Sequence, residues 1–172
     1  MQNNFPGITY SGIGVNGAKC SDYNKFPLFY EQLPALQPDL IVISLGTNES
    51  FDKQSADQYF SQLDQMIAAI KAKAPLATLL VTTPPPSVLH RKYTNTFIAD
   101  YAQKIKENAP AKGYAVWDLF EVFGGNKNIF NNAAKGLMAR DKVHYSKMGY
   151  EKQADLFFEA FLQSYETFKS TK

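Results

Sequence analysis

Apolar residues in this chain fall into two patterns, short continuous runs and stripes at helical spacing. The run over residues 40–45, Leu-Ile-Val-Ile-Ser-Leu, is typical of a strand that is buried on both faces of a parallel sheet. Residues 79–81 and 114–117 are shorter runs of the same kind. Residues 8–11 are predicted to be a further short strand, which leads into a glycine-rich turn. Together these segments predict the strands of one sheet.

Between the runs, apolar side chains recur at the spacing of a helix face. Ser55 and Ser146 are expected N-caps, and Pro75 is expected to end the first long helix. Strand and helix alternate throughout, which predicts a three-layer α/β/α domain with a parallel sheet over residues 1–172. The helical stripes lie within 59–70, 93–105 and 150–165, and a helical or irregular segment precedes them at 21–36.

The composition of the chain argues against several kinds of binding and structural site. The net charge of +2 gives no basis for binding nucleic acid or a membrane surface, and no long uncharged apolar run predicts a membrane span. With Cys20 as the single cysteine, no internal disulfide can form, and two histidines make a structural zinc site improbable. Residues 1–6 do not have the pattern of a signal peptide.

Polar or glycine-rich segments follow three of the predicted strands, at 12–17, 46–50 and 84–87. In parallel sheets the carboxyl ends of the strands carry the binding site, so these exits are expected to meet at one edge. Within the second exit, Gly46 permits a tight turn and Asn48 can present its amide as a donor to an oxyanion. An ordinary strand-to-helix turn explains the same residues equally well.

The first exit, Gly12–Gly17, matches the G-x-G-x-x-G pattern of dinucleotide-binding folds. That pattern requires an acidic residue at the end of the following strand, whereas Asp39 stands at the beginning of its strand. We therefore reject this interpretation, although a nucleotide-binding flavodoxin-like domain stays as a minor alternative. The loop is either a flexible turn or a place where the backbone N–H of Gly17 points into a site beside Asn48.

The strongest chemical signal is Asp141-x-x-His144, which lies just before the last predicted helix. A carboxylate this close can accept the Nδ1 proton of the ring and fix its tautomer, which leaves Nε2 as a general base for a hydroxyl nucleophile. The alternative is an ordinary capping aspartate beside a surface histidine.

These residues together resemble the SGNH (GDSL-type) serine esterases and acylhydrolases. In this chain Gly17, in Val-Asn-Gly-Ala, matches the block that carries an oxyanion glycine, and Asn48, in Gly-Thr-Asn-Glu, matches the block of the oxyanion asparagine, with Glu where Asp is usual. Asp141 and His144 match the last block. The resemblance implies a flavodoxin-like sheet, catalytic roles for Asp141 and His144, an oxyanion hole at Gly17 and Asn48, and no cofactor or metal.

The family's first block, Gly-Asp-Ser with its nucleophilic serine, does not occur in the sequence. The resemblance therefore implies the C-terminal portion of a larger hydrolase, without the first, central strand of its sheet and inactive by itself. No serine of the chain is expected to replace the nucleophile, because none is predicted to lie on a tight strand-to-helix elbow. The serines at or near strand exits are Ser11, Ser21, Ser50 and Ser87.

Residues 11–30 are further similar to envelope members of the family from bacteria, including peptidoglycan O-acetylesterases. This similarity implies an ester-bearing substrate such as an acetylated glycan, and a periplasmic or secreted location. The expected partner is the missing N-terminal part or another copy of the chain. A different class of function stays open, namely a non-catalytic carbohydrate- or partner-binding module that has lost its nucleophile.

Overall fold

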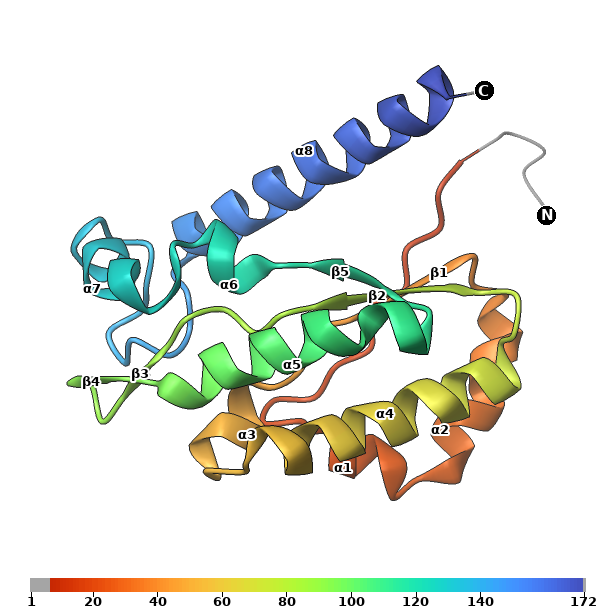
Figure 1. Cartoon of the computed structure of the whole chain (residues 1–172), viewed down its shortest axis with the longest axis horizontal. Helices are drawn as coiled ribbons and strands as arrows, with labels where there is room; N and C mark the ends of the chain where they lie inside the picture. The colour runs from red at the N-terminus through yellow and green to blue at the C-terminus, as the bar shows by residue number, and fades with distance from the viewer. Residues whose placement is uncertain (1–6, 172) are drawn as a thin grey trace.

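A computed structural model describes residues 7–171. Its centre is a parallel sheet in the order β1-β2-β5, flanked by helices, which confirms the predicted α/β fold (Figure 1). The expectation about a signal peptide rests on residues 1–6, which lie outside the described residues. The strands of this sheet are β1 (Leu40–Ile43), β2 (Thr78–Thr82) and β5 (Ala115–Trp117).

Helices connect these strands, and a small antiparallel hairpin follows β2. The hairpin consists of β3 (Val88–Leu89) and β4 (Tyr93–Thr94). The helices are α1 (Cys20–Asn24), α2 (Pro27–Gln32), the 3-10 helix η1 (Leu33–Leu36), α3 (Thr47–Phe51), α4 (Ala56–Lys73), α5 (Thr96–Lys112), α6 (Leu119–Val122), α7 (Gly125–Ala134) and α8 (Lys147–Ser170).

The main core lies where α4 and α5 pack against the sheet (Figure 1). Tyr59 of α4 and Tyr101 of α5 are fully buried and stack with their ring centroids 4.3 Å apart. The predicted N-cap of α4 is confirmed, since the Ser55 hydroxyl accepts a hydrogen bond from the Gln58 backbone at 3.2 Å and the Gln58 side chain accepts one from the Ser55 backbone at 2.8 Å. This reciprocal capping fixes where the helix starts.

One predicted element is wrong, and another starts later than predicted. Residues 8–11 are not a strand, and Ile8 and Tyr10 are 99% and 90% exposed. A strand needs a neighbour for its backbone hydrogen bonds, and the described residues offer this segment none. Tyr93 belongs to β4 rather than to a helix, because α5 starts only after Asn95, whose backbone N–H donates to the Ser87 carbonyl at 3.0 Å.

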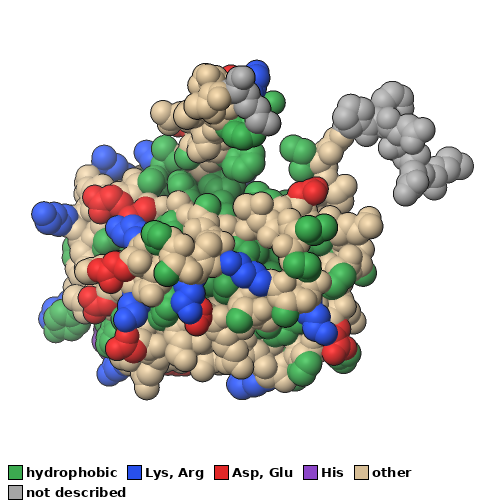
Figure 2. Space-filling model, turned by 45° about the vertical axis from the view of Figure 1, so that its right-hand side comes forward, with side chains coloured by type: hydrophobic (Ala, Val, Ile, Leu, Met, Phe, Trp, Pro, Cys, Tyr) green, Lys and Arg blue, Asp and Glu red, His purple; other side chains and the backbone are tan. Residues whose placement is uncertain are grey.

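The last helix forms as predicted, but its apolar stripe is largely uncovered. Phe158 is 61% and Tyr165 is 52% exposed, and Figure 2 shows hydrophobic side chains gathered below the projecting helix. In the first half of α8, the rings of Phe157 and Trp117 lie 4.9 Å apart.

Strand β1 is likewise less covered than its sequence predicts. Its side chains Leu40 and Val42 are 38% and 44% exposed, so the expectation of burial on both faces is wrong for this strand. The reason is its place at the edge of the described sheet, where only β2 pairs with it. None of the helices within residues 7–171 has both the length and the apolar character needed to cross a membrane.

Candidate active site

The exit of β1 is built around a glycine in a conformation that other residues rarely adopt. Gly46 has φ of +119°, and a Cβ atom there would lie 3.0 Å from Pro84 Cγ and 3.1 Å from the Tyr59 hydroxyl. Only glycine fits this contact without strain. The exits of β1 and β2 are therefore packed against each other, as the sequence predicted for parallel neighbours.

Asn48, at the start of α3, lies against the loop that contains Gly17. Its Nδ2 donates to the Ala18 carbonyl at 2.9 Å, which uses one of the two N–H groups of the amide. Gly17 has φ of +79° in a turn closed by a 3.0 Å hydrogen bond from Ala18 N to the Val15 carbonyl. The structure thus brings the two predicted oxyanion donors onto adjacent segments.

Glu49 strengthens the same connection, a role that the sequence analysis did not assign. Its Oε1 accepts a 2.8 Å hydrogen bond from the backbone N–H of Cys20, and the residue is only 1% exposed. Adjacent residues of α3 therefore hold residues 18–20 from both sides. Burial, and to a lesser extent the nearby Glu49 carboxylate, raises the pKa of the Cys20 thiol well above its usual range.

Asp141 and His144 form the pair that their spacing predicted. Asp141 Oδ2 lies 2.7 Å from His144 Nδ1, and Asp141 Oδ1 accepts backbone hydrogen bonds from Val143 at 2.9 Å and His144 at 3.0 Å. Partial burial opposes ionisation of this carboxylate, but the hydrogen bonds outweigh it and hold the pKa of Asp141 below its usual value. With Nδ1 engaged, Nε2 of the exposed imidazole is the ring atom available to a reactant.

The loop that carries this pair is attached to the exit of β2. The Val88 backbone donates to the Lys142 carbonyl at 2.9 Å, and the Tyr145 hydroxyl donates to the Pro86 carbonyl at 2.9 Å. Both Val88 and Tyr145 are buried. The sequence indicated the exit and the loop separately, but no local pattern could show this link between residues more than fifty positions apart.

A buried polar cluster joins the exit of β1 to the exit of β2. Asn95 Nδ2 donates to Ser50 Oγ at 2.8 Å, in α3, and to Ser87 Oγ at 3.1 Å, at the exit of β2. Both serines are fully buried, so neither presents a free hydroxyl to the imidazole. Asn48 and His144 are thus connected through the same edge of the sheet, and the described residues show no direct hydrogen bond between them.

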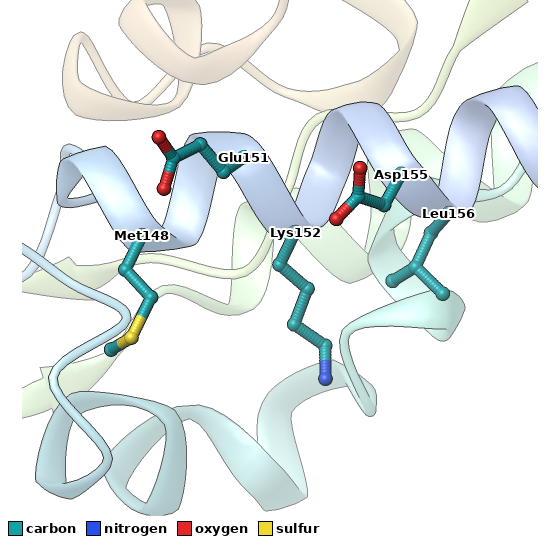
Figure 3. Close-up of a pocket in the computed structure, with 5 residues that line it drawn as sticks. All are labelled: Met148, Glu151, Lys152, Asp155 and Leu156. Atoms are coloured by element: carbon teal, nitrogen blue, oxygen red, sulfur yellow. The ribbon is translucent and has the colours of Figure 1, made fainter.

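Of the four predicted site residues, Gly17 and His144 are exposed, and Asn48 and Asp141 are half-buried. The groove drawn in Figure 3 contains none of them, because α8 alone supplies its lining. Met148, Lys152 and Leu156 extend below the helix in this view, and Glu151 and Asp155 complete the lining.

Comparisons with known proteins identify the family and the fold of this chain. The model of the GDSL-like Lipase/Acylhydrolase family matches residues 2–152. A solved structure of a peptidoglycan O-acetylesterase is similar with a TM-score of 0.84 at 22% identity, covering 91% of this chain and 47% of that one. This chain thus spans about half of that enzyme's length.

Two further structures have the same fold. A lipase/acylhydrolase from Enterococcus faecalis has a TM-score of 0.65 at 22% identity, covering 84% of this chain and 70% of its own. An acetylxylan esterase from Geobacillus stearothermophilus has a TM-score of 0.61 at 21% identity, covering 83% and 67%. A search of curated proteins gave no match.

Proposed function

The chain belongs to the GDSL-like lipase/acylhydrolase family, and from this premise we propose that it carries the general base and the oxyanion hole of a serine esterase that removes acetyl groups from glycans. The observation that carries the proposal is the 2.7 Å hydrogen bond between Asp141 and His144, on a loop attached to the rim where Asn48 lies. The names of two similar structures, a peptidoglycan O-acetylesterase and an acetylxylan esterase, support acetylated glycans as the substrate class.

In the proposed reaction a serine hydroxyl attacks the ester carbonyl while His144 Nε2 accepts its proton. Asp141 holds the ring and stabilises the imidazolium, which then returns the proton to the leaving alcohol. The backbone N–H of Gly17 and the amide of Asn48 bind the developing oxyanion, and losing one such donor costs about 3 kcal/mol of transition-state stabilisation. Hydrolysis of the acyl intermediate repeats these steps with water.

We propose that the serine comes from outside these 172 residues, on a strand that pairs with the free edge of β1. Three features support this. The sequence has no Gly-Asp-Ser, Leu40 and Val42 of the β1 edge are exposed, and the apolar stripe of α8 is uncovered. A parallel strand followed by a helix would cover these surfaces and complete a flavodoxin-like sheet.

The test compares the chain alone with the chain joined to a serine-bearing N-terminal segment, taken from the similar peptidoglycan O-acetylesterase. We expect hydrolysis of 4-nitrophenyl acetate only by the joined protein, with turnover lost in its His144→Ala variant and strongly reduced in Asn48→Ala. Turnover by the chain alone that disappears in His144→Ala would show that the nucleophile is already present.

A joined protein that unfolds cooperatively yet hydrolyses no acetyl ester would contradict the esterase proposal. It would favour the second class of function, a binding module that keeps the shape of the site.

A further inference from the structure

Two loops beside the Asp141–His144 pair carry an unusual concentration of positive charge. The whole chain has 18 Lys and Arg against 16 Asp and Glu. Residues 88–95 and 135–147 together contain six of these cations and a single acid, Asp141, which is already hydrogen-bonded to His144. We call this set the cationic rim, and its members are Arg91, Lys92, Lys135, Arg140, Lys142 and Lys147.

The cationic rim is held next to the proposed general base by hydrogen bonds between its two loops. Besides the bond from Val88 to the Lys142 carbonyl, Lys142 Nζ donates to the Arg91 carbonyl at 3.3 Å. The β3–β4 hairpin thus lies along the 139–145 loop (Figure 1). The charges of the cationic rim therefore border the position that an ester must occupy to reach His144.

Most of these cations have no acidic partner. Elsewhere the lysines at positions 19, 104, 106 and 112 form ion pairs with aspartates. In the cationic rim, the described residues give an ion pair only to Lys147, with Glu151 at 3.7 Å. Exposed positive charges that lack acidic partners create a positive local potential, which attracts anions.

Backbone conformation gives an independent reason to ascribe a function to these residues. His90 and Arg91 are the central residues of a tight turn closed by a 3.0 Å hydrogen bond from Lys92 N to the Leu89 carbonyl, and their φ values are +51° and +60°. Such turns favour Asn-Gly, because other residues are strained there. Lys142, which is next to Asp141, has φ of +57° and is the third residue of these two loops with a strained backbone. Strain of this kind tends to collect at functional sites.

We propose that the cationic rim selects glycans that carry negative charge next to the acetyl ester, as carboxylates or phosphates, over neutral glycans. This inference rests on the proposed function, whose substrate class it narrows. The acetyl ester itself is neutral, so the charges are not needed for the reaction with His144. They would instead bind the polymer on either side of the reacting sugar.

The test measures binding, so it does not depend on the missing serine. Three oligomers of equal length are titrated into the 172-residue chain by calorimetry and NMR: acetylated oligogalacturonate, acetylated xylo-oligosaccharide and poly(glycerol phosphate). We expect at least one anionic oligomer to bind about tenfold more tightly than the neutral one, and this advantage to shrink as salt is added. The two anionic oligomers distinguish carboxylate from phosphate as the recognised group.

The informative variant is His90→Asn with Arg91→Gly and Lys92→Gln, which installs the preferred turn and removes two charges. We expect its Tm to rise while its affinity for the anionic oligomer falls roughly five- to tenfold. A purely structural role for these residues predicts the opposite change in Tm. The control is Lys73→Gln, which removes one exposed charge at the end of α4, just before β2 begins and hence at the opposite ends of the strands.

Equal affinity for neutral and anionic oligomers would overturn the inference. So would wild-type affinity in the triple variant, an equal loss in the control, or tighter binding of a single-stranded DNA oligomer. Hydrolysis of 4-nitrophenyl acetate by the joined protein is a separate measurement on a small neutral ester. Failure of the esterase proposal and failure of the charge-selection proposal are therefore distinguishable.

Discussion

Replacing Gly149 by alanine is expected to destabilise the protein, although alanine is the better helix former. Gly149 lies in the first turn of α8 and is buried. A Cβ atom there would lie 2.0 Å from the Leu137 carbonyl oxygen and 3.0 Å from Tyr145 Cδ1. The clash is with backbone next to the 139–145 loop, so the added methyl group pushes α8 away from the segment that carries the proposed base.

The magnitude follows from two opposing effects. Intrinsic helix propensity favours alanine by about 1 kcal/mol. Overpacking against a fixed backbone costs about 3 kcal/mol. The Leu137 carbonyl also accepts a hydrogen bond from Ser146 N at 3.0 Å, and losing it costs about 1 kcal/mol more. The expected balance is a loss of about 3 kcal/mol in the free energy of unfolding.

Urea denaturation followed by circular dichroism measures this free energy directly. Ser164→Ala is the matched control, because Ser164 lies exposed in the same helix and its replacement should change stability by no more than about 0.5 kcal/mol. Amide exchange at His144 reports whether the neighbouring loop loosens in Gly149→Ala. A variant as stable as the wild type, with unchanged exchange, would refute the steric argument.

Three further outcomes are expected. Because the fold lowers the pKa of Asp141, its stabilisation is complete above the ordinary value of about 3.9 and is lost at lower pH. The difference in urea stability between the wild type and Asp141→Asn should therefore shrink as the pH falls from about 5 to about 2, and a growing difference would contradict this. Gly46→Ala should cost about 2 kcal/mol in thermal unfolding, since φ of +119° and the contact with Pro84 leave no room for a side chain, and an unchanged Tm would count against that reading. The isolated chain should self-associate in light scattering, and Phe158→Gln with Phe161→Gln should reduce this, because these side chains are 61% and 49% exposed; a monomeric wild type would show that the stripe does not drive association.

Elements whose burial shows directly in the sequence were predictable. The apolar runs located β1, β2 and β5, and the stripe over residues 59–70 located α4 with its cap. Helix α7 (Gly125–Ala134) was not predicted, because its segment is rich in Asn and begins with Gly, residues that are typical of turns and loops. Residues 8–11 have strand character without a neighbour in the described residues, and pairing depends on distant parts of a chain rather than on local preference.

In the proposed site, too, contacts between near neighbours in the sequence were predictable and contacts between distant segments were not. The Asp141–His144 bond joins residues three positions apart, so spacing was enough to predict it. The approach of Asn48 to the Gly17 loop was one of two interpretations of that loop, and the hydrogen bond from Cys20 to Glu49 was not expected at all. Bonds of that kind connect separate loops, and a single sequence has no local signal for them.

The attachment of the 139–145 loop has a practical consequence. Its hydrogen bonds to Pro86 and Val88 both lie within this chain, so the proposed acid–base pair does not depend on a serine-bearing segment for its position. If this chain and a serine-bearing segment are produced separately, ester cleavage reports whether the two have bound each other. The chain then offers one half of a split reporter, whose background depends on how tightly the halves associate without help.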